Sequence, residues 1–485
     1  MPESNHQRAS DRFKSIGTIV FMMALEFLMI SCTVGPNYKR PTINIPQDYS
    51  GRMAPEVAAV SSSPSIADER WTSIFGDPVL EGLIREALAN NLDLRIAAQR
   101  ILEMQAEVGI IRGQQFPSIE AGGRDASIQL PSKLTSQPGG LLDKSFLTGG
   151  GPSASSVWNL DFWGLYRRQT QAARADLLAS EWAQKTVTST LVESVADAYF
   201  DLRGLDAQLA ITEETIAARK ESLQLTQALE QQGAGSLADV RQAEELLHTA
   251  QANIPVLRRQ IAIEENSISV LRGHMPEAIG RGLPIQDEPH PLQVPTGIPS
   301  ELLERRPDIQ EAEAKLIAAN ARIGVARAQY FPQISLTSAG GVSSNQLSSL
   351  FTSGSTYWYA IGSISQPIFE GGRIRSNYRL SQVQKQEMVA RYQKTILDAF
   401  RDVSDALVSY KEIREYREEQ AAHVTAATDA VRLARLRYSG GNANYLEVLT
   451  TDTDLYSAQL VLARAEQQEA ASLVQLYAAL GGGWQ

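Results

Sequence analysis

Side chains that could catalyse a reaction or bind a metal are few in this chain and lie far apart in the sequence. The five histidines share no spacing that would place a metal-binding pair on one helix face: His6, His248, His274, His290 and His423. No nucleophile motif accompanies them, and Gly371-Gly372 opens no phosphate-binding loop. The sequence therefore predicts no catalytic residue, no metal site and no bound cofactor. An enzyme is the first rival hypothesis, and metal-dependent hydrolysis would revive it.

The only cysteine, Cys32, stands where its thiol has a specific chemistry. Basic residues precede an apolar run over residues 16–30, which is the order of an export signal and is short for a membrane span. The run ends in LMISC at residues 28–32, which resembles a lipoprotein cleavage box. We expect residues 1–31 to be a signal peptide and Cys32 to carry a covalent lipid. Thr33 follows Cys32 in place of aspartate, which in known bacterial lipoproteins favours the outer membrane over the inner. The alternative to lipidation is that Cys32 is a free or buried cysteine.

The composition is that of a folded chain without a basic surface. Apolar residues make up 43% of it and aromatic residues 7%. A net charge of -10 offers no surface for a phosphate backbone, so we expect no nucleic-acid partner. After Cys32, no stretch is long and apolar enough to cross a bilayer as a helix.

The chain is internally duplicated. Residues 91–117 return as residues 306–332 at a constant offset of 215, so that Gly109 matches Gly324. A second block returns at an offset of 208, where Gly233 matches Gly441. Because both blocks keep their order, the chain contains two copies of one unit. We expect a lipidated, proline-rich tether over residues 32–70, a first structural repeat over 71–290 and a second over 291–485.

Each repeat predicts a long helical hairpin. No proline occurs between residues 165 and 232 or between 373 and 438, and apolar residues in each stretch recur at steps of three and four. A helix over either stretch would be about 100 Å long, so such helices must lie side by side. Glycine-bearing turns at residues 233–236 and 440–443 end them. We expect hairpins over about 165–272 and 372–480.

Four segments alternate as strands do. They lie at about residues 117–130, 154–163, 331–343 and 356–369, and together they make two hairpins. Each is about as long as a tilted transmembrane strand. The alternative is a small soluble sheet that caps a helical bundle.

A membrane sheet of four strands requires an oligomer. Four strands cannot close a barrel, and an open sheet edge in lipid leaves backbone groups unpaired at several kcal/mol each. Three copies would supply twelve strands and a ring of helical columns. The predicted fold is therefore mixed and mainly α: duplicated antiparallel helical hairpins that form a trimeric α-barrel, with four strands per chain in a twelve-stranded transmembrane β-barrel.

Four strings in order resemble one known family. They are CTVGPNY at residues 32–38, LLERRPDI at 302–309, IGVARAQYFP at 323–332 and ALGGGW at 479–484. Together they span the mature chain and are similar to the TolC-like outer membrane factors, especially the lipoprotein branch that includes OprM and NodT. The resemblance implies a homotrimeric duct in the outer membrane that extends into the periplasm. It also implies a periplasmic adaptor and an inner-membrane pump of the resistance-nodulation-division type, whose proton gradient drives export through a passive channel.

The resemblance also places a gate just after the second glycine turn. Leu446, Glu447 and Thr450 match the family's constricting residues, and the first-repeat counterpart of Glu447 is Asp239. Three Glu447 carboxylates in a narrow bore would attract cations. The alternative is that Glu447 and Asp239 only stabilise helix N-termini. Ala443 replaces an arginine of some members, and Thr450 an aspartate of many.

The glycine turns are the candidate adaptor contacts, because the repeat brings both to one end. This set of tip residues comprises Gly233, Gly235, Ser236, Leu237, Gly440, Gly441 and Asn442. The alternative is that these residues only close the hairpins. A second rival function is a lipid-anchored periplasmic coiled-coil scaffold without a pore. The exported compound and the partner pump cannot be read from these residues.

Overall fold

The computed structural model describes most of the chain. The described residues are 33–44, 65–69, 71–74, 76–129, 146–287, 294–295 and 299–484. The predicted signal peptide over residues 1–31 and the predicted lipidation site, Cys32, lie outside them. Across this described part, none of the helices combines the length and the apolar character needed to cross a bilayer.

Two compact units divide the chain, and each draws on both repeats. Unit 1 comprises residues 1–41, 102–179 and 313–391, and unit 2 comprises 42–101, 180–312 and 392–485. The predicted boundary at residue 290 therefore separates the two copies in sequence without separating the compact units. The reason is that the long helices of each copy contribute residues to both units.

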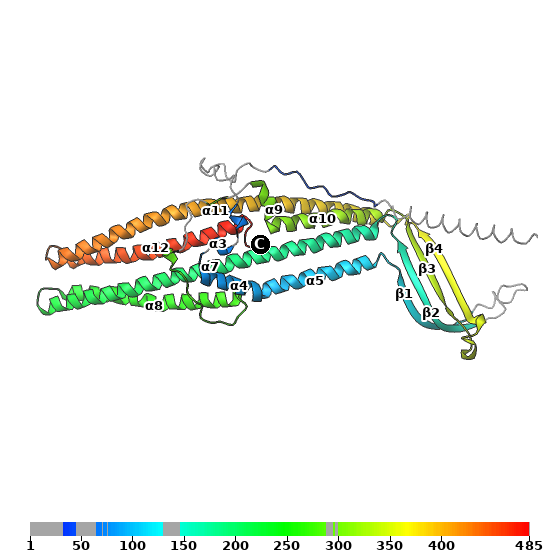
Figure 1. The fold of residues 1–485 in the computed structure, drawn as a ribbon, viewed down its shortest axis with the longest axis horizontal. Helices are drawn as coiled ribbons and strands as arrows, with labels where there is room; N and C mark the ends of the chain where they lie inside the picture. Colours follow the sequence, from blue (N-terminus) through cyan, green and yellow to red (C-terminus); the bar gives the residue numbers. More distant parts are fainter. Residues whose placement is uncertain are drawn as a thin grey trace, which may run out of the picture. The chain divides into compact units, whose positions relative to one another are not determined.

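Unit 1 contains a four-stranded antiparallel sheet (Figure 1). Its strands, in spatial order, are β1 (Ser118–Gln129), β2 (Phe146–Leu160), β3 (Gln333–Val342) and β4 (Thr356–Ser365). β2 begins at Phe146, eight residues before its predicted start at residue 154. The backbone hydrogen bonds between β1 and β2 continue through a Gly-rich segment, in which Gly150 pairs with Asp125. Strand pairing uses backbone groups and needs no side chain, so the apolar pattern failed to reveal this extension. β4 ends at Ser365 rather than 369, and Pro367 follows, which cannot donate to a ladder.

Long helices adjoin the sheet within unit 1. The sheet-side segments belong to four helices: α5 (Leu92–Gly113), α7 (Leu165–Gln231), α10 (Pro307–Ala328) and α11 (Arg373–Ser439). Two tryptophans of the β2 end fasten this junction. Trp158 donates to the carbonyl of Gln115 at 3.0 Å, and Trp163 donates to that of Pro332 at 2.8 Å while it stacks on Phe331. These contacts fix the end of β2 to the segments that follow α5 and α10.

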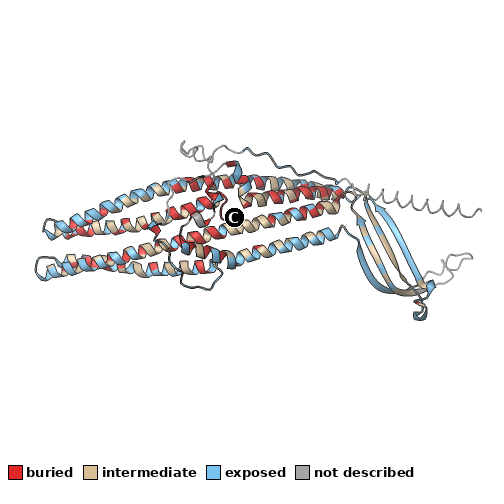
Figure 2. Cartoon of the chain, viewed as in Figure 1, coloured by how far each residue is buried: buried red, intermediate tan, exposed pale blue. Residues whose placement is uncertain are grey.

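Unit 2 is built from two helical hairpins and short elements that pack between them. α7 pairs with α8 (Leu237–Leu271), and α11 pairs with α12 (Tyr445–Ala479). The remaining elements are η1 (Ile66–Asp68), α3 (Trp71–Ile74), α4 (Pro78–Asn90), η2 (Ile285–Asp287), η3 (Pro299–Glu301) and α9 (Leu302–Arg305). In unit 1, η4 (Leu347–Ser349) and η5 (Ser353–Ser355) precede β4. Buried residues are concentrated along the middle of the helices, and exposed residues predominate at the hairpin turns (Figure 2).

A buried acid fixes the short elements of unit 2 to α7. Asp77 caps α4 by accepting from the Val79 amide at 2.7 Å. Its other oxygen accepts from the hydroxyl of the fully buried Tyr199 at 2.6 Å and from the Leu283 amide at 3.0 Å. Burial, with the bond to Asp77, raises the pKa of Tyr199. Each polar group is satisfied, as burial requires.

Candidate functional site

The two hairpin turns have nearly the same backbone geometry. Gly233 and Gly441 adopt φ of +74° and +71°, the left-handed conformation that glycine tolerates. The amides that follow donate back into the preceding helix, from Ala234 to the Leu229 carbonyl and from Asn442 to the Arg437 carbonyl, both at 2.8 Å. The predicted tip residues therefore form the ends of two matching helical hairpins.

The predicted gate residues lie on the first turns of α8 and α12. Asp239 completes a capping box, since its side chain accepts from the Ser236 amide at 3.3 Å. Glu447 forms an ion pair with Arg437 at 2.7 Å, and Leu446 is 58% exposed. The Thr450 hydroxyl donates to the Leu446 carbonyl of its own helix at 2.9 Å. Asp239 thus stabilises the start of α8, and Glu447 forms an ion pair across the second turn. Their role in a gate stays a prediction.

A buried ion pair links the two hairpins, and the sequence did not predict it. Arg219 of α7 is 4% exposed and binds Asp452 of α12 at 2.9 Å. It also donates to the Leu246 carbonyl of α8 at 2.8 Å and lies over the ring of Tyr456. Asp452 in turn binds Arg435 of α11 at 3.2 Å. One buried ion pair therefore touches all four hairpin helices.

Tyrosine hydroxyls add two further links between the hairpins. Tyr445 of α12 lies 2.9 Å from the Ser222 hydroxyl of α7. Tyr456 lies 3.1 Å from the Thr212 hydroxyl of α7 and accepts from Asn253 of α8 at 3.1 Å. Burial raises the pKa of Tyr445, so it stays protonated and able to donate at neutral pH.

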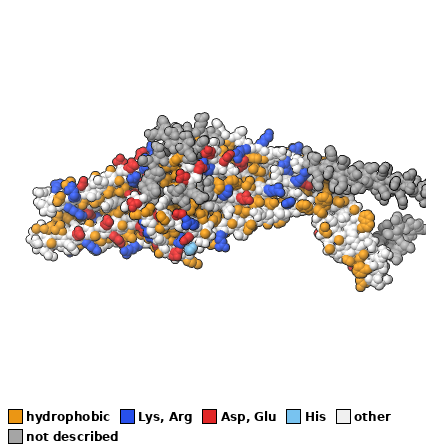
Figure 3. All heavy atoms as spheres, viewed as in Figure 1, with side chains coloured by type: hydrophobic (Ala, Val, Ile, Leu, Met, Phe, Trp, Pro, Cys, Tyr) orange, Lys and Arg blue, Asp and Glu red, His pale blue; other side chains and the backbone are white. Residues whose placement is uncertain are grey.

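A groove of about 860 Å³ lies beside these contacts and is lined by α7, α11 and α12. Its walls carry the charged side chains of Asp452 and Arg435 and apolar side chains such as Leu225 and Val431. Figure 3 shows the same mixture of charged and apolar side chains over the helices.

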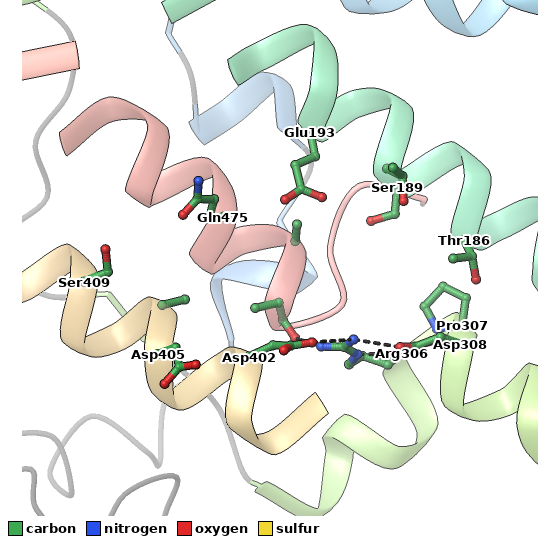
Figure 4. A pocket seen from close by; sticks show the side chains of 14 residues that line it. Thr186, Ser189, Glu193, Arg306, Pro307, Asp308, Asp402, Asp405, Ser409 and Gln475 are labelled. Atoms are coloured by element: carbon green, nitrogen blue, oxygen red, sulfur yellow. Dashed lines mark hydrogen bonds and ion pairs between the residues drawn. The ribbon is translucent and has the colours of Figure 1, made fainter. Parts of the chain in front are cut away.

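A second pocket in unit 2, of about 460 Å³, is lined by four carboxyl side chains and one arginine among mostly small and neutral residues (Figure 4). Arg306 bridges Asp308 at 2.7 Å and Asp402 at 3.3 Å within it. Glu193 of α7 also lines it, and burial raises the pKa of this carboxyl. One turn along α7, burial and the neighbouring acids raise the pKa of Asp197 to about 7. The described residues contain no cluster of metal ligands.

Comparison with known proteins places this architecture in one family. The family model described as "Outer membrane efflux protein" matches residues 83–274 and 298–482. The chain belongs to the outer membrane efflux protein family. The family match spans both repeats, so the duplication read from the sequence is a property of the family's fold.

Two relatives and one solved structure that match nearly the whole chain support this assignment. A toluene efflux pump outer membrane protein, TtgC of Pseudomonas putida, is 36% identical over 96% of both chains. The cation efflux system protein CusC of Escherichia coli is 32% identical, over 94% of this chain and 97% of its own. A crystal structure of a membrane protein from Pseudomonas aeruginosa matches with a TM-score of 0.84 at 32% identity, over 93% of this chain and 98% of that one.

The family assignment confirms the predicted fold class, location and function. The chain is an outer membrane efflux channel of a tripartite export system, with the fold of trimeric channels that combine a helical barrel and a β-barrel. The scaffold without a pore finds no support. Enzymes are not among these relatives, which belong to a transport family.

Proposed function

We propose that the two hairpins of unit 2 form the periplasmic gate of this channel and that the Arg219–Asp452 pair holds it closed. The observation that supports this is the buried ion pair that joins α7 to α12 a few turns from the hairpin ends. Removing one partner of a buried pair strongly destabilises the structure that contains it, because the other charge stays buried without a partner. In this proposal the hairpins occupy two discrete arrangements, with the pair made in the closed one and broken in the open one, as a gate requires.

Glu447, on the first turn of α12, would also affect which ions pass the gate. In a trimer, three copies of Glu447 would approach one another around the bore, where like charges are poorly screened. Arg437, which binds Glu447 at 2.7 Å, would then offset part of this repulsion while the gate is closed. Opening would expose the carboxylates and favour cations.

The chain acts in this scheme as a passive duct that catalyses no reaction. Energy would come from an inner-membrane pump of the resistance-nodulation-division type, and a periplasmic adaptor would contact the hairpin ends at Leu237 and Asn442. Leu237 is 57% exposed at the start of α8, so it is available to a partner. Relatives of similar identity are named for toluene and for cation efflux. A wide water-filled duct needs few specific contacts, so we infer that the pump selects the substrate.

Anchoring by a covalent lipid on Cys32 completes the proposal. Cys32 lies outside the described residues, and the support comes from the LMISC string at residues 28–32 and from its position after the apolar run. Intact-mass measurement of the mature chain tests this directly, because acylation adds a diacylglyceryl group to a chain that begins at Cys32.

Efflux complementation tests the gate. Tyr445→Phe removes only the hydroxyl that lies 2.9 Å from Ser222 and keeps the ring in place. We expect it to leave trimer yield and efflux unchanged and to make the outer membrane leakier to a large antibiotic. Thr451→Ser, on the same helix but outside the interhelical links, serves as the control. Equal leakage in both variants would remove the Tyr445 link from the gate.

A further inference from the structure

The segment that follows Cys32 is bound to unit 1 by specific contacts. Residues 33–40 of this segment, termed the strap, lie along α10 and form part of the dark-blue trace in Figure 1. The Val34 amide donates to the carbonyl of Trp163 at 3.1 Å, at the end of β2. Thr33 packs so closely on Gly164 that a Cβ there would come within 2.7 Å of its side chain. The strap therefore begins at the junction of sheet and helix.

Arg168 provides the first binding point for the strap. This side chain is only 4% exposed and donates to the carbonyls of Val34 and Gly35, both at 3.3 Å, and to the side-chain oxygen of Asn37 at 3.0 Å. Gly35, with φ of +107°, passes over Gly324 of α10 so closely that a Cβ on it would lie 2.5 Å from the Gly324 Cα. The fit leaves room for glycine alone at these two positions.

Two buried polar side chains of α10 provide the remaining binding points. Asn320, which is fully buried, donates to the carbonyl of Pro36 at 2.9 Å. Glu313, which is 7% exposed, accepts from the Tyr38 hydroxyl at 3.0 Å and from two nitrogens of Arg40 at 2.8 and 2.5 Å. A buried carboxylate requires such partners, and Tyr38 and Arg40 of the strap supply them to Glu313. Arg168, Asn320 and Glu313 together are termed the seat.

The duplication shows that the seat is a specialised feature. At the repeat offsets, the three positions of the seat are occupied in the other copy by Ser376, Gln105 and Ala98. The backbone is alike in both copies, since Gly164 and its counterpart Gly372 have φ of +78° and +86°. A Cβ on Gly372 or on Gly109, the counterpart of Gly324, would nevertheless meet nothing within 4 Å. The fold itself therefore does not require Arg168, Asn320 and Glu313.

We propose that the seat couples the lipid anchor to the channel, by binding residues 33–40 so that a lipid on Cys32 is tied to the sheet end of unit 1. A chain has one N-terminus, which explains why only one of the two copies carries a seat. The coupling would place the anchor and the strands at the membrane together and so favour insertion and assembly. This inference rests on the lipid anchoring and channel function proposed above.

The test uses the full-length precursor in a host that acylates lipoproteins. The seat variant combines Arg168→Ser, Asn320→Gln and Glu313→Ala, each of which is the residue that the other copy of the same fold carries. The matched control combines the reverse changes Ser376→Arg, Gln105→Asn and Ala98→Glu. Glu313→Gln, which removes only the charge, provides a milder second variant. Three quantities are measured: the acyl mass on Cys32, the rate of trypsin cleavage after Lys39 in outer membranes, and the yield of membrane-inserted trimer.

We expect the seat variant to keep its acyl mass, to be cleaved after Lys39 at least about tenfold faster and to give at most about one third of the wild-type trimer. Glu313→Gln should shift both quantities in the same direction by a smaller factor, and the matched control should equal wild type. Unchanged cleavage would show that the seat does not hold the strap. Faster cleavage with full trimer yield would show that the seat has no role in assembly.

These outcomes remain separate from failure of the proposed function. A wild-type chain without acyl mass would refute lipid anchoring, and with it the coupling, whatever the channel conducts. A wild-type trimer that is acylated but does not conduct would refute the channel and would leave the cleavage and yield comparison intact.

Discussion

The most informative perturbation is the removal of one charge from the buried pair between the hairpins. Asp452→Asn leaves the 4% exposed guanidinium of Arg219 without a carboxylate, while its bond to the Leu246 carbonyl remains. Breaking a buried pair costs about 3–5 kcal/mol. Because Asp452 is itself 13% exposed and Arg219 keeps one acceptor and the Tyr456 ring, we take the lower end, about 3 kcal/mol.

In the proposed gate the change acts on the closed arrangement alone, because the pair would be broken once the hairpins separate. A loss of about 3 kcal/mol shifts the ratio of open to closed channels by roughly 100-fold. Planar bilayer recordings of the purified trimer measure this ratio as open probability and conductance. Arg435→Gln is the matched control, since Arg435 is 45% exposed and its bond to Asp452 is a surface pair worth about 0–1 kcal/mol.

Equal open probability in wild type and Asp452→Asn would refute this reasoning. The result would be decisive if thermal unfolding also showed the variant to be less stable, because the pair would then support the fold without holding a gate. Effects of equal size in Asp452→Asn and Arg435→Gln would show that surface charge, and not the buried contact, controls opening.

Three further changes test other parts of the account. Glu447→Gln removes the carboxylate that Arg437 binds, so the cation preference of the pore should fall by about twofold or more; an unchanged reversal potential would reject Glu447 as a filter. Asp197→Asn replaces a carboxyl whose pKa burial raises to about 7. The folded chain keeps this proton between about pH 4 and pH 7 and the unfolded chain releases it, so wild type loses stability as pH rises through that window. The unfolding free energy that Asp197→Asn gains over wild type should be about 1–3 kcal/mol larger at pH 8 than at pH 4. Equal gains at both pH values would contradict the burial argument. Leu237→Arg should lower efflux at least about tenfold at unchanged trimer yield because it charges an exposed tip, whereas Leu237→Ala should be mild; intact efflux in Leu237→Arg would exclude this tip from the adaptor contact.

Much of the fold could be predicted because its signals are periodic. The absence of proline over 165–232 and the apolar steps of three and four predicted the long helices, and the glycines at 233 and 441 predicted their turns. The fold class followed from four strands, which cannot close a wall alone. The predicted start of β2 at residue 154 was wrong, because Gly149 and Gly150 pair through backbone groups and so leave no apolar pattern in the sequence.

The polar links of the site could not be predicted, because their partners lie far apart in sequence. Arg219 and Asp452 are 233 positions apart, and nothing in either neighbourhood indicates the other. One signal was available: Arg219 occupies a position of the apolar seam of α7, where a charge needs a partner. The strap was predicted only as an extended tether, since prolines indicate extension and say nothing of Glu313 or Arg168.

The most direct test of the central claim is the single-channel current of the purified full-length chain in a planar bilayer. The account predicts stepwise conductance from a three-copy assembly, with a higher open probability in Asp452→Asn than in wild type. A three-copy assembly that inserts in the bilayer and carries no current in either form would contradict it.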